Sequence, residues 1–129
     1  MKTPRDHAES LLFKASHDLI AARVILAAGD AFDTACFHAQ RAVEKSLKAV
    51  LALHEIEYPR RHDVGELLEL VKPLAPEVAQ YAEGIINLAP YVVEIRYEVE
   101  FEPSDDQATE AVQTAVDVYE LIRQVIERK

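Results

Sequence analysis

Apolar residues recur at the spacing of an α-helix over the first 28 residues of the chain. Thr3 is suited to cap this predicted helix, Pro4 to occupy its first position, and Gly29 to end it. Two apolar stripes run along the helix, and such a helix is buried on more than one side. We therefore expect it to lie at the centre of a bundle or to contact a partner chain. The first stripe comprises Leu11, Leu12, Ala15, Leu19, Ala22 and Leu26, and the second comprises Phe13, Ile20, Val24 and Ala27.

A second helix is predicted from Asp30, a candidate N-cap residue, to about His54. Residues 55–61 then have the composition of a loop. A short third helix begins at Asp63, whose carboxylate can cap it, and ends before Pro73. The apolar face of the second helix comprises Cys36, Ala39, Val43, Leu47, Val50 and Leu51.

Pro76 begins a predicted fourth helix that runs through Ile86. Residues 91–101 fit two patterns, because their apolar positions alternate as in a strand and also recur as in a helix. A lone strand has no partner in this chain, so we favour helix to about Tyr97, followed by an extended acidic loop. The strand alternative requires pairing with another chain. Ser104 opens a capping box, S-x-x-Q, at the start of a long last helix.

These elements amount to four long helices and one short one. The sequence of 129 residues contains only three Gly, whereas all-β folds need many turn glycines. Half of the residues are hydrophobic, which is enough for the core of one domain. We expect an all-α fold, an antiparallel four-helix bundle with one additional short helix, as a single domain over residues 1–129.

The net charge of −9 argues against a protein that coats DNA or RNA, since such a protein needs a basic surface. The acidity is uneven. Residues 1–62 hold nine Lys/Arg and eight Asp/Glu, and residues 63–129 hold five and fifteen, so the halves carry +1 and −10. The second half therefore offers an acidic face to a partner protein.

Cys36 is the one cysteine, so no intramolecular disulfide is possible, and its apolar neighbours predict a buried, inert thiol. No histidine follows an acidic residue at the Glu-x-x-His spacing of di-iron bundles. We therefore expect no metal site and no other cofactor. The polar N-terminal segment and the absence of an 18-residue apolar run predict a cytoplasmic protein without a membrane span.

The second predicted helix carries a basic stripe of His38, Arg41, Lys45 and Lys48. Their spacing places them within about 80° of one another around the helix, opposite its apolar face. A surface of this kind can bind a phosphate or a nucleotide. The alternative is a solvated face on which Glu44 pairs with Lys48.

Further cations lie outside this stripe and are secondary candidates. Arg60, Arg61 and His62 precede a predicted helix N-terminus, which attracts anions, but the two arginines can equally be solvated. Arg96, with Tyr97 beside it, can reach a phosphate or pair with the glutamates around it.

Residues 35–49, ACFHAQRAVEKSLKA, resemble the signature of the HEPN family (higher eukaryotes and prokaryotes nucleotide-binding domain), A-x-F-H-x-Q-Q-A-x-E-K-x-L-K-A. The segment HDVGELL at residues 62–68 is similar to the family's H-D-L-x-x-L-L. Arg96 and Tyr97 are similar to its R-Y-P segment, although Glu98 replaces the proline. The three matches occur in the family's order and span nearly the whole chain.

This resemblance implies an all-α bundle, commonly dimeric, that is often encoded beside a minimal nucleotidyltransferase and can form a complex with it. It also implies a nucleotide or phosphate site at the basic stripe and Arg96, with Gln40 and Glu44 fixing helix packing. Many HEPN proteins are metal-independent ribonucleases that use an Arg and a His separated by four to six residues. In this chain Arg96 is followed at those positions by Phe101, Glu102 and Pro103, and no other arginine has the spacing.

The leading hypothesis is therefore a non-catalytic HEPN-like protein that dimerises and binds a nucleotide, a minimal nucleotidyltransferase, or both. One alternative is a divergent HEPN ribonuclease that acts as the toxin of a toxin–antitoxin pair. A second alternative is a structural interaction module whose acidic half contacts a basic partner.

Overall fold

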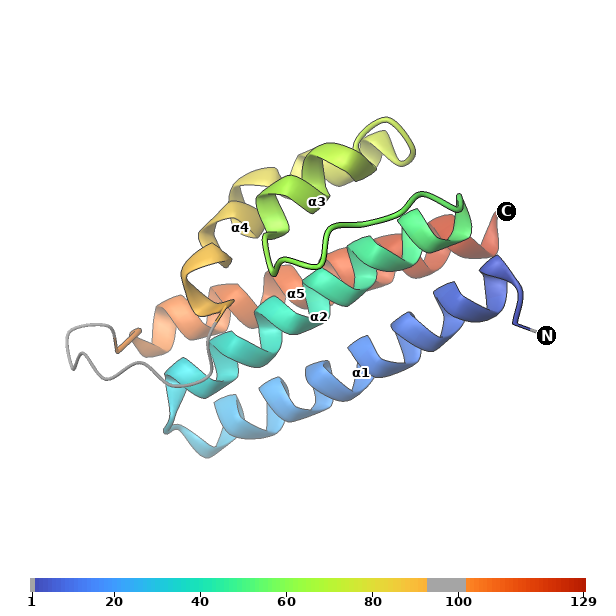
Figure 1. The fold of residues 1–129 in the computed structure, drawn as a ribbon. Helices are drawn as coiled ribbons and strands as arrows, with labels where there is room; N and C mark the ends of the chain where they lie inside the picture. The colour runs from blue at the N-terminus through green and yellow to red at the C-terminus, as the bar shows by residue number, and fades with distance from the viewer. Residues whose placement is uncertain (1, 93–101) are drawn as a thin grey trace.

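The computed structural model describes residues 2–92 and 102–129, and within these ranges the chain forms helices and turns without a strand (Figure 1). The expected all-helical fold is therefore confirmed. The ambiguous residues 93–101, which include Arg96 and Tyr97, lie outside the described residues. The helices are α1 (Pro4–Ala28), α2 (Phe32–Leu53), α3 (Val64–Val71), the 3-10 helix η1 (Pro76–Tyr81), α4 (Ala82–Asn87), the 3-10 helix η2 (Ala89–Val92) and α5 (Asp105–Glu127).

The long helices α1, α2 and α5 run alongside one another, α3 packs on a further side of α2, and α4 packs on α3 and α5 (Figure 1). The loop that precedes α3 runs back along α2 (Figure 1). Helix α2 is the central element, because it contacts α1, α3, η2 and α5. Its predicted apolar face is buried, as expected. Burying one Leu or Ile side chain stabilises a fold by about 1.5–3 kcal/mol. The largest fully buried apolar side chains are Leu47, Leu51, Leu67, Leu68, Ile85, Leu88 and Ile122.

Helix α1 lies at the edge of the bundle rather than at its centre. Its first apolar stripe is buried against α2 and α5, whereas its second stripe faces outward. Phe13, Ile20 and Val24 of that second stripe keep 60%, 59% and 64% of their surface exposed. The central position was one of the two alternatives for this helix, and the structure excludes it because α2 occupies that place.

Three predicted helix starts are confirmed by their capping hydrogen bonds. The side chains of Thr3, Asp63 and Ser104 each accept a hydrogen bond from the backbone N–H three residues later, at 3.0, 3.1 and 3.1 Å. The predicted N-cap at Asp30 is wrong. Its carboxylate accepts from the adjacent N–H of Ala31 at 2.8 Å, and Ala31, with φ 52°, is the residue that precedes α2.

The long fourth helix predicted from Pro76 is also wrong, because η1, α4 and η2 take its place. The backbone at Tyr81 (φ −105°, ψ 9°) and Tyr91 (φ −91°, ψ 19°) departs from helical values. Val78 and Ile85 are buried as expected, whereas Ile86 is 50% exposed, and these residues belong to separate short helical segments. One of these pieces approaches α5 closely: a Cβ at Gly84 would lie only 2.7 Å from Thr114 Oγ1 and 3.0 Å from Thr114 Cγ2.

We expect Gly84→Ala to lower the free energy of unfolding by about 1–2 kcal/mol, because the added methyl group collides with Thr114 and this outweighs the gain in helix propensity. Thr114→Ala removes the obstacle, so in that background Gly84→Ala should be neutral or stabilising. Urea unfolding of the four proteins followed by circular dichroism measures both values. Equal effects of Gly84→Ala in the two backgrounds would contradict this account of the contact.

Candidate functional site

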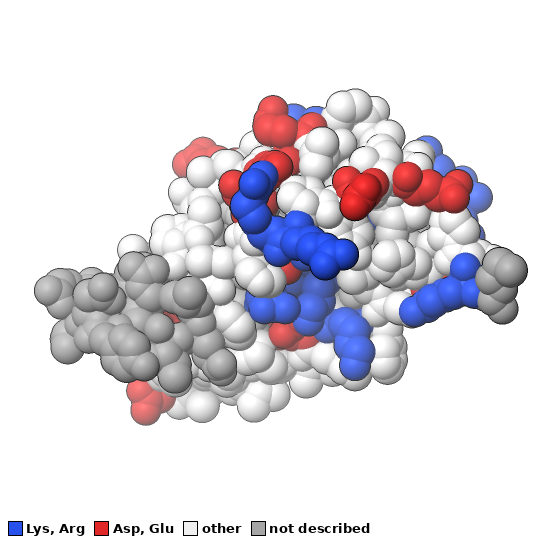
Figure 2. All heavy atoms as spheres, viewed as in Figure 1, with Lys and Arg blue, Asp and Glu red and all other residues white. Residues whose placement is uncertain are grey.

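The basic stripe lies on a side of α2 that is only partly open to solvent. The side chains of His38, Arg41, Lys45 and Lys48 are 23%, 29%, 23% and 12% exposed. The Glu44–Lys48 pair of the alternative interpretation is present at 3.1 Å. The stripe is not a fully solvated face, however, because acidic and aromatic side chains of α1, α2 and the loop before α3 surround it. Figure 2 shows Lys and Arg side chains gathered near the middle of this face, with carboxylates visible between them.

Asp18 of α1 holds two members of the stripe. One carboxylate oxygen lies 3.0 Å from His38 Nδ1, and the other accepts a hydrogen bond from Lys45 Nζ at 2.6 Å. Sequence reasoning missed Asp18. The available signal was its position beside Leu19 of the buried stripe, where a charged residue needs a partner from a neighbouring helix. The pair joins α1 to α2 and orients both basic side chains.

Glu44 holds the other end of the stripe. It is only 1% exposed, and its carboxylate contacts Lys48 Nζ at 3.1 Å and His62 Nδ1 at 2.8 Å. Burial raises the pKa of Glu44, but the hydrogen bond from His62 and the charge and hydrogen bond of Lys48 together outweigh it, so the pKa is lower than usual. Glu44 is therefore ionised at neutral pH, and the interaction anchors the loop before α3 onto α2.

Arg41 differs from the other basic side chains of α2. Its closest carboxylate oxygen, on Glu44, is 4.0 Å from Nε, and no acceptor among the described residues forms a hydrogen bond with that nitrogen. The guanidinium carbon lies 5.8 Å from the centre of the Phe37 ring, one helical turn away. Arg41 thus combines a partly exposed guanidinium, whose buried Nε has no hydrogen-bond partner among the described residues, with an adjacent aromatic ring.

Of the secondary candidates on the loop before α3, Arg61 is held in an ion pair and Arg60 is exposed. Arg61 Nη2 donates to both carboxylate oxygens of Glu66 at 2.7 Å, which fixes it to the first turn of α3. Arg60 is exposed and lines a hollow of about 740 Å³ beside the N-terminal end of α1. Within that hollow, the Tyr58 hydroxyl lies 3.2 Å from His7 Nε2. Neither of these two residues was identified from the sequence.

The described residues give little support to a reactive cysteine or to a protein metal site. Cys36 is buried, as expected, and burial raises the pKa of its thiol to about 11, so it is not a nucleophile at neutral pH. In residues 2–92 and 102–129, no three His, Cys, Asp or Glu side chains gather into a group that could hold a metal ion. None of the helices described here is long and apolar enough to cross a membrane.

We expect Glu44→Gln to lower the free energy of unfolding at pH 7 by about 1–3 kcal/mol, because Lys48 and His62 lose a buried charged acceptor. The folded protein lowers the pKa of Glu44, so this stability is present above the unfolded pKa of about 4.3 and is lost as the pH falls through the folded value. The Glu44 carboxylate takes up its proton roughly between pH 6 and pH 3. Over this range the variant, which lacks that carboxylate, should therefore lose less stability than the wild type. Chemical unfolding at several pH values tests this, and parallel pH curves for the two proteins would contradict it.

The comparisons with known proteins agree with this fold. A family model described as the HEPN domain matches residues 8–125. Among solved structures, the crystal structure of ST0689, an archaeal HEPN homologue, is similar with a TM-score of 0.75 at 23% sequence identity. The alignment covers 98% of this chain and 99% of that one. No curated protein matches. Because the HEPN model spans most of the sequence, the chain belongs to the HEPN domain family.

Proposed function

We propose that this HEPN protein is a non-catalytic accessory protein that binds a nucleotide on the α2 face and supports a minimal nucleotidyltransferase. The observation that carries the proposal is the position of Arg41 beside Phe37, where the nearest carboxylate oxygen among the described residues, on Glu44, is 4.0 Å from Nε. A guanidinium can bind two phosphate oxygens at once, and an aromatic ring can stack on a base.

The charges around Arg41 favour a small anion over a long nucleic acid. Arg41, Lys45 and Lys48 are opposed by Asp18 and Glu44, which leaves a net charge of +1. One excess positive charge suits a single phosphate group, whereas a polynucleotide needs many phosphate contacts. The two carboxylates also hold Lys45 and Lys48 in place, so little side-chain freedom is lost on binding.

We expect ATP or GTP to raise the melting temperature, since a ligand at 100 times its Kd stabilises a protein by about 2.7 kcal/mol. Arg41→Ala should weaken nucleotide affinity at least about tenfold, because a charge-assisted hydrogen bond contributes about 1.5–3 kcal/mol. Arg123→Ala, which removes an exposed arginine of α5, is the matched control. Differential scanning fluorimetry with and without nucleotide measures the shift for each variant against its own unliganded protein.

A melting temperature that neither ATP nor GTP changes would refute the nucleotide site. An Arg41→Ala shift equal to that of wild type would show that the nucleotide binds elsewhere.

One observation favours a second candidate function, a divergent ribonuclease. Asp18 lies 3.0 Å from His38 Nδ1, an arrangement that orients an imidazole for acid–base chemistry, and Arg41 lies one helical turn further on. Incubation with a labelled oligoribonucleotide distinguishes the two candidates. Cleavage by the wild type that His38→Asn abolishes would favour the ribonuclease, and nucleotide binding without cleavage favours the accessory protein.

We further infer that the protein forms a homodimer through the outward stripe of α1. HEPN domains often dimerise, and Phe13, Ile20 and Val24 form an apolar strip along one face of α1 about 16 Å long. His17 lies within this strip, with its ring centre 4.5 Å from that of Phe13. Apolar strips with this exposure are typical of protein interfaces.

We expect the wild type to be a dimer and Ile20→Lys to be a folded monomer, because a dimer would bury the charge without a partner. Ile86→Lys changes an exposed isoleucine of α4, outside the strip, and should remain dimeric. Light scattering coupled to size-exclusion chromatography gives the masses. A monomeric wild type, or a dimer that survives Ile20→Lys, would contradict this interface.

A further inference from the structure

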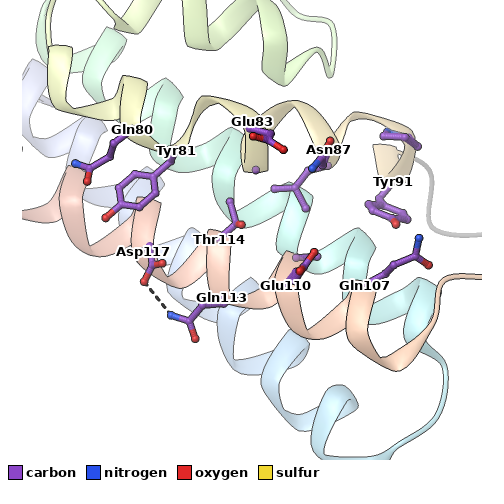
Figure 3. Close-up of a pocket in the computed structure, with 14 residues that line it drawn as sticks. Gln80, Tyr81, Glu83, Asn87, Tyr91, Gln107, Glu110, Gln113, Thr114 and Asp117 are labelled. Atoms are coloured by element: carbon purple, nitrogen blue, oxygen red, sulfur yellow. Dashed lines mark hydrogen bonds between the residues drawn. The ribbon is translucent and has the colours of Figure 1, made fainter.

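A groove separate from the α2 basic face lies between α5 and the segment formed by η1, α4 and η2. It has a volume of about 760 Å³, and side chains from both sides project toward it (Figure 3). Gly84 and Thr114 both line the groove, and α4 approaches α5 closely there because Gly84 lacks a side chain. On α5 the lining extends from Gln107 to Asp117, which is about 15 Å along the helix.

The groove is acidic. Glu83 of α4 and Glu110 and Asp117 of α5 line it, and no Lys or Arg is among its described lining residues. The labelled side chains of Glu83 and Glu110 extend from opposite walls (Figure 3). Cationic groups are therefore favoured in this groove and phosphates are repelled.

The carboxylates of the groove are available to a ligand. Within the described chain Glu83 and Glu110 make no ion pair, and Asp117 accepts one hydrogen bond, from Gln113 Nε2 at 2.9 Å. The acidic residues further along α5 differ, since Glu120 and Glu127 both pair with Arg123. The carboxylates that line the groove are therefore not engaged in ion pairs with the described residues.

Aromatic rings complete the lining. Tyr81 and Tyr91 border the groove from its η1 and η2 ends (Figure 3). Tyr91 lies beside the buried thiol of Cys36 of α2, and its own burial raises the pKa of the Tyr91 hydroxyl to about 12. Tyrosine faces attract guanidinium and ammonium groups, so the rings and the carboxylates favour the same kind of ligand.

We propose that this groove binds a basic segment of a partner protein, with Arg or Lys side chains placed against Glu83, Glu110 and Asp117. Charge complementarity carries the assignment, because the residues described in the lining include three carboxylates and no Lys or Arg. Glu110 and Asp117 lie two helical turns apart, about 10 Å, which matches roughly three residues of an extended peptide. This role is additional to nucleotide binding at Arg41 and uses different helices.

The test uses two fluorescein-labelled peptides of Gly and Ser, one with two arginines three positions apart and the other with glutamines in their place. Fluorescence anisotropy at low salt should show binding of the arginine peptide and weaker binding at high salt. The groove variant Glu83→Gln/Glu110→Gln should bind it about tenfold more weakly, since two exposed ion pairs are lost. The control Glu9→Gln/Glu57→Gln removes the same charge from exposed residues outside the groove and should bind as wild type does.

Three results would overturn the proposal. The first is equal binding of the two peptides. The second is an equal loss in the groove and control variants, which would indicate attraction by net charge alone. The third is a change of oligomeric state in the groove variant, measured by light scattering, which would identify a second copy of the chain as the occupant. Because the groove variant keeps Arg41, its nucleotide-induced shift should equal that of wild type, so the two proposals can fail independently.

Discussion

Glu44 is a charged carboxylate in the interior of the central helix, and a buried charge is stable only when cations and hydrogen-bond donors surround it. Lys48 from the next turn and His62 from the loop before α3 supply them. The loop must therefore run back along α2 to reach the carboxylate, and this course brings Asp63 to the point where α3 begins. The path of the chain between α2 and α3 and the position of Lys48 both depend on this interaction, whereas Asp18 holds His38 and Lys45.

The parts of the fold that were predictable from the sequence are those decided by neighbours in the chain. Capping at Thr3, Asp63 and Ser104 needs only a side-chain oxygen and a backbone N–H three residues later, so the local pattern suffices. The fourth helix shows the limit of this reasoning. Its apolar spacing is helical, but η1 and α4 pack on α5 and η2 packs on α2, and no local pattern encodes these contacts.

The candidate site was predictable in its residues but not in its surroundings. Helical periodicity placed His38, Arg41, Lys45 and Lys48 on one face. The HEPN signature contains His38, Lys45 and Lys48 but has Gln at the position of Arg41. Neither indicated that Asp18, 27 residues before Lys45, would hold that lysine, since such a pair depends on how α1 packs on α2. The acidic groove is also a product of the tertiary fold, because its two walls are separated in the chain and share no motif.

The turn between α1 and α2 has a consequence for how the chain folds. Only residues 29–31 separate the two helices, and Gly29 (φ 73°) and Ala31 (φ 52°) both have left-handed backbone conformations. Closing so short a loop costs little chain entropy, whereas α5 must be brought back across most of the sequence. The α1–α2 hairpin is thus suited to form early and to present the face of α2 onto which α5 later packs, an order in which local contacts precede distant ones.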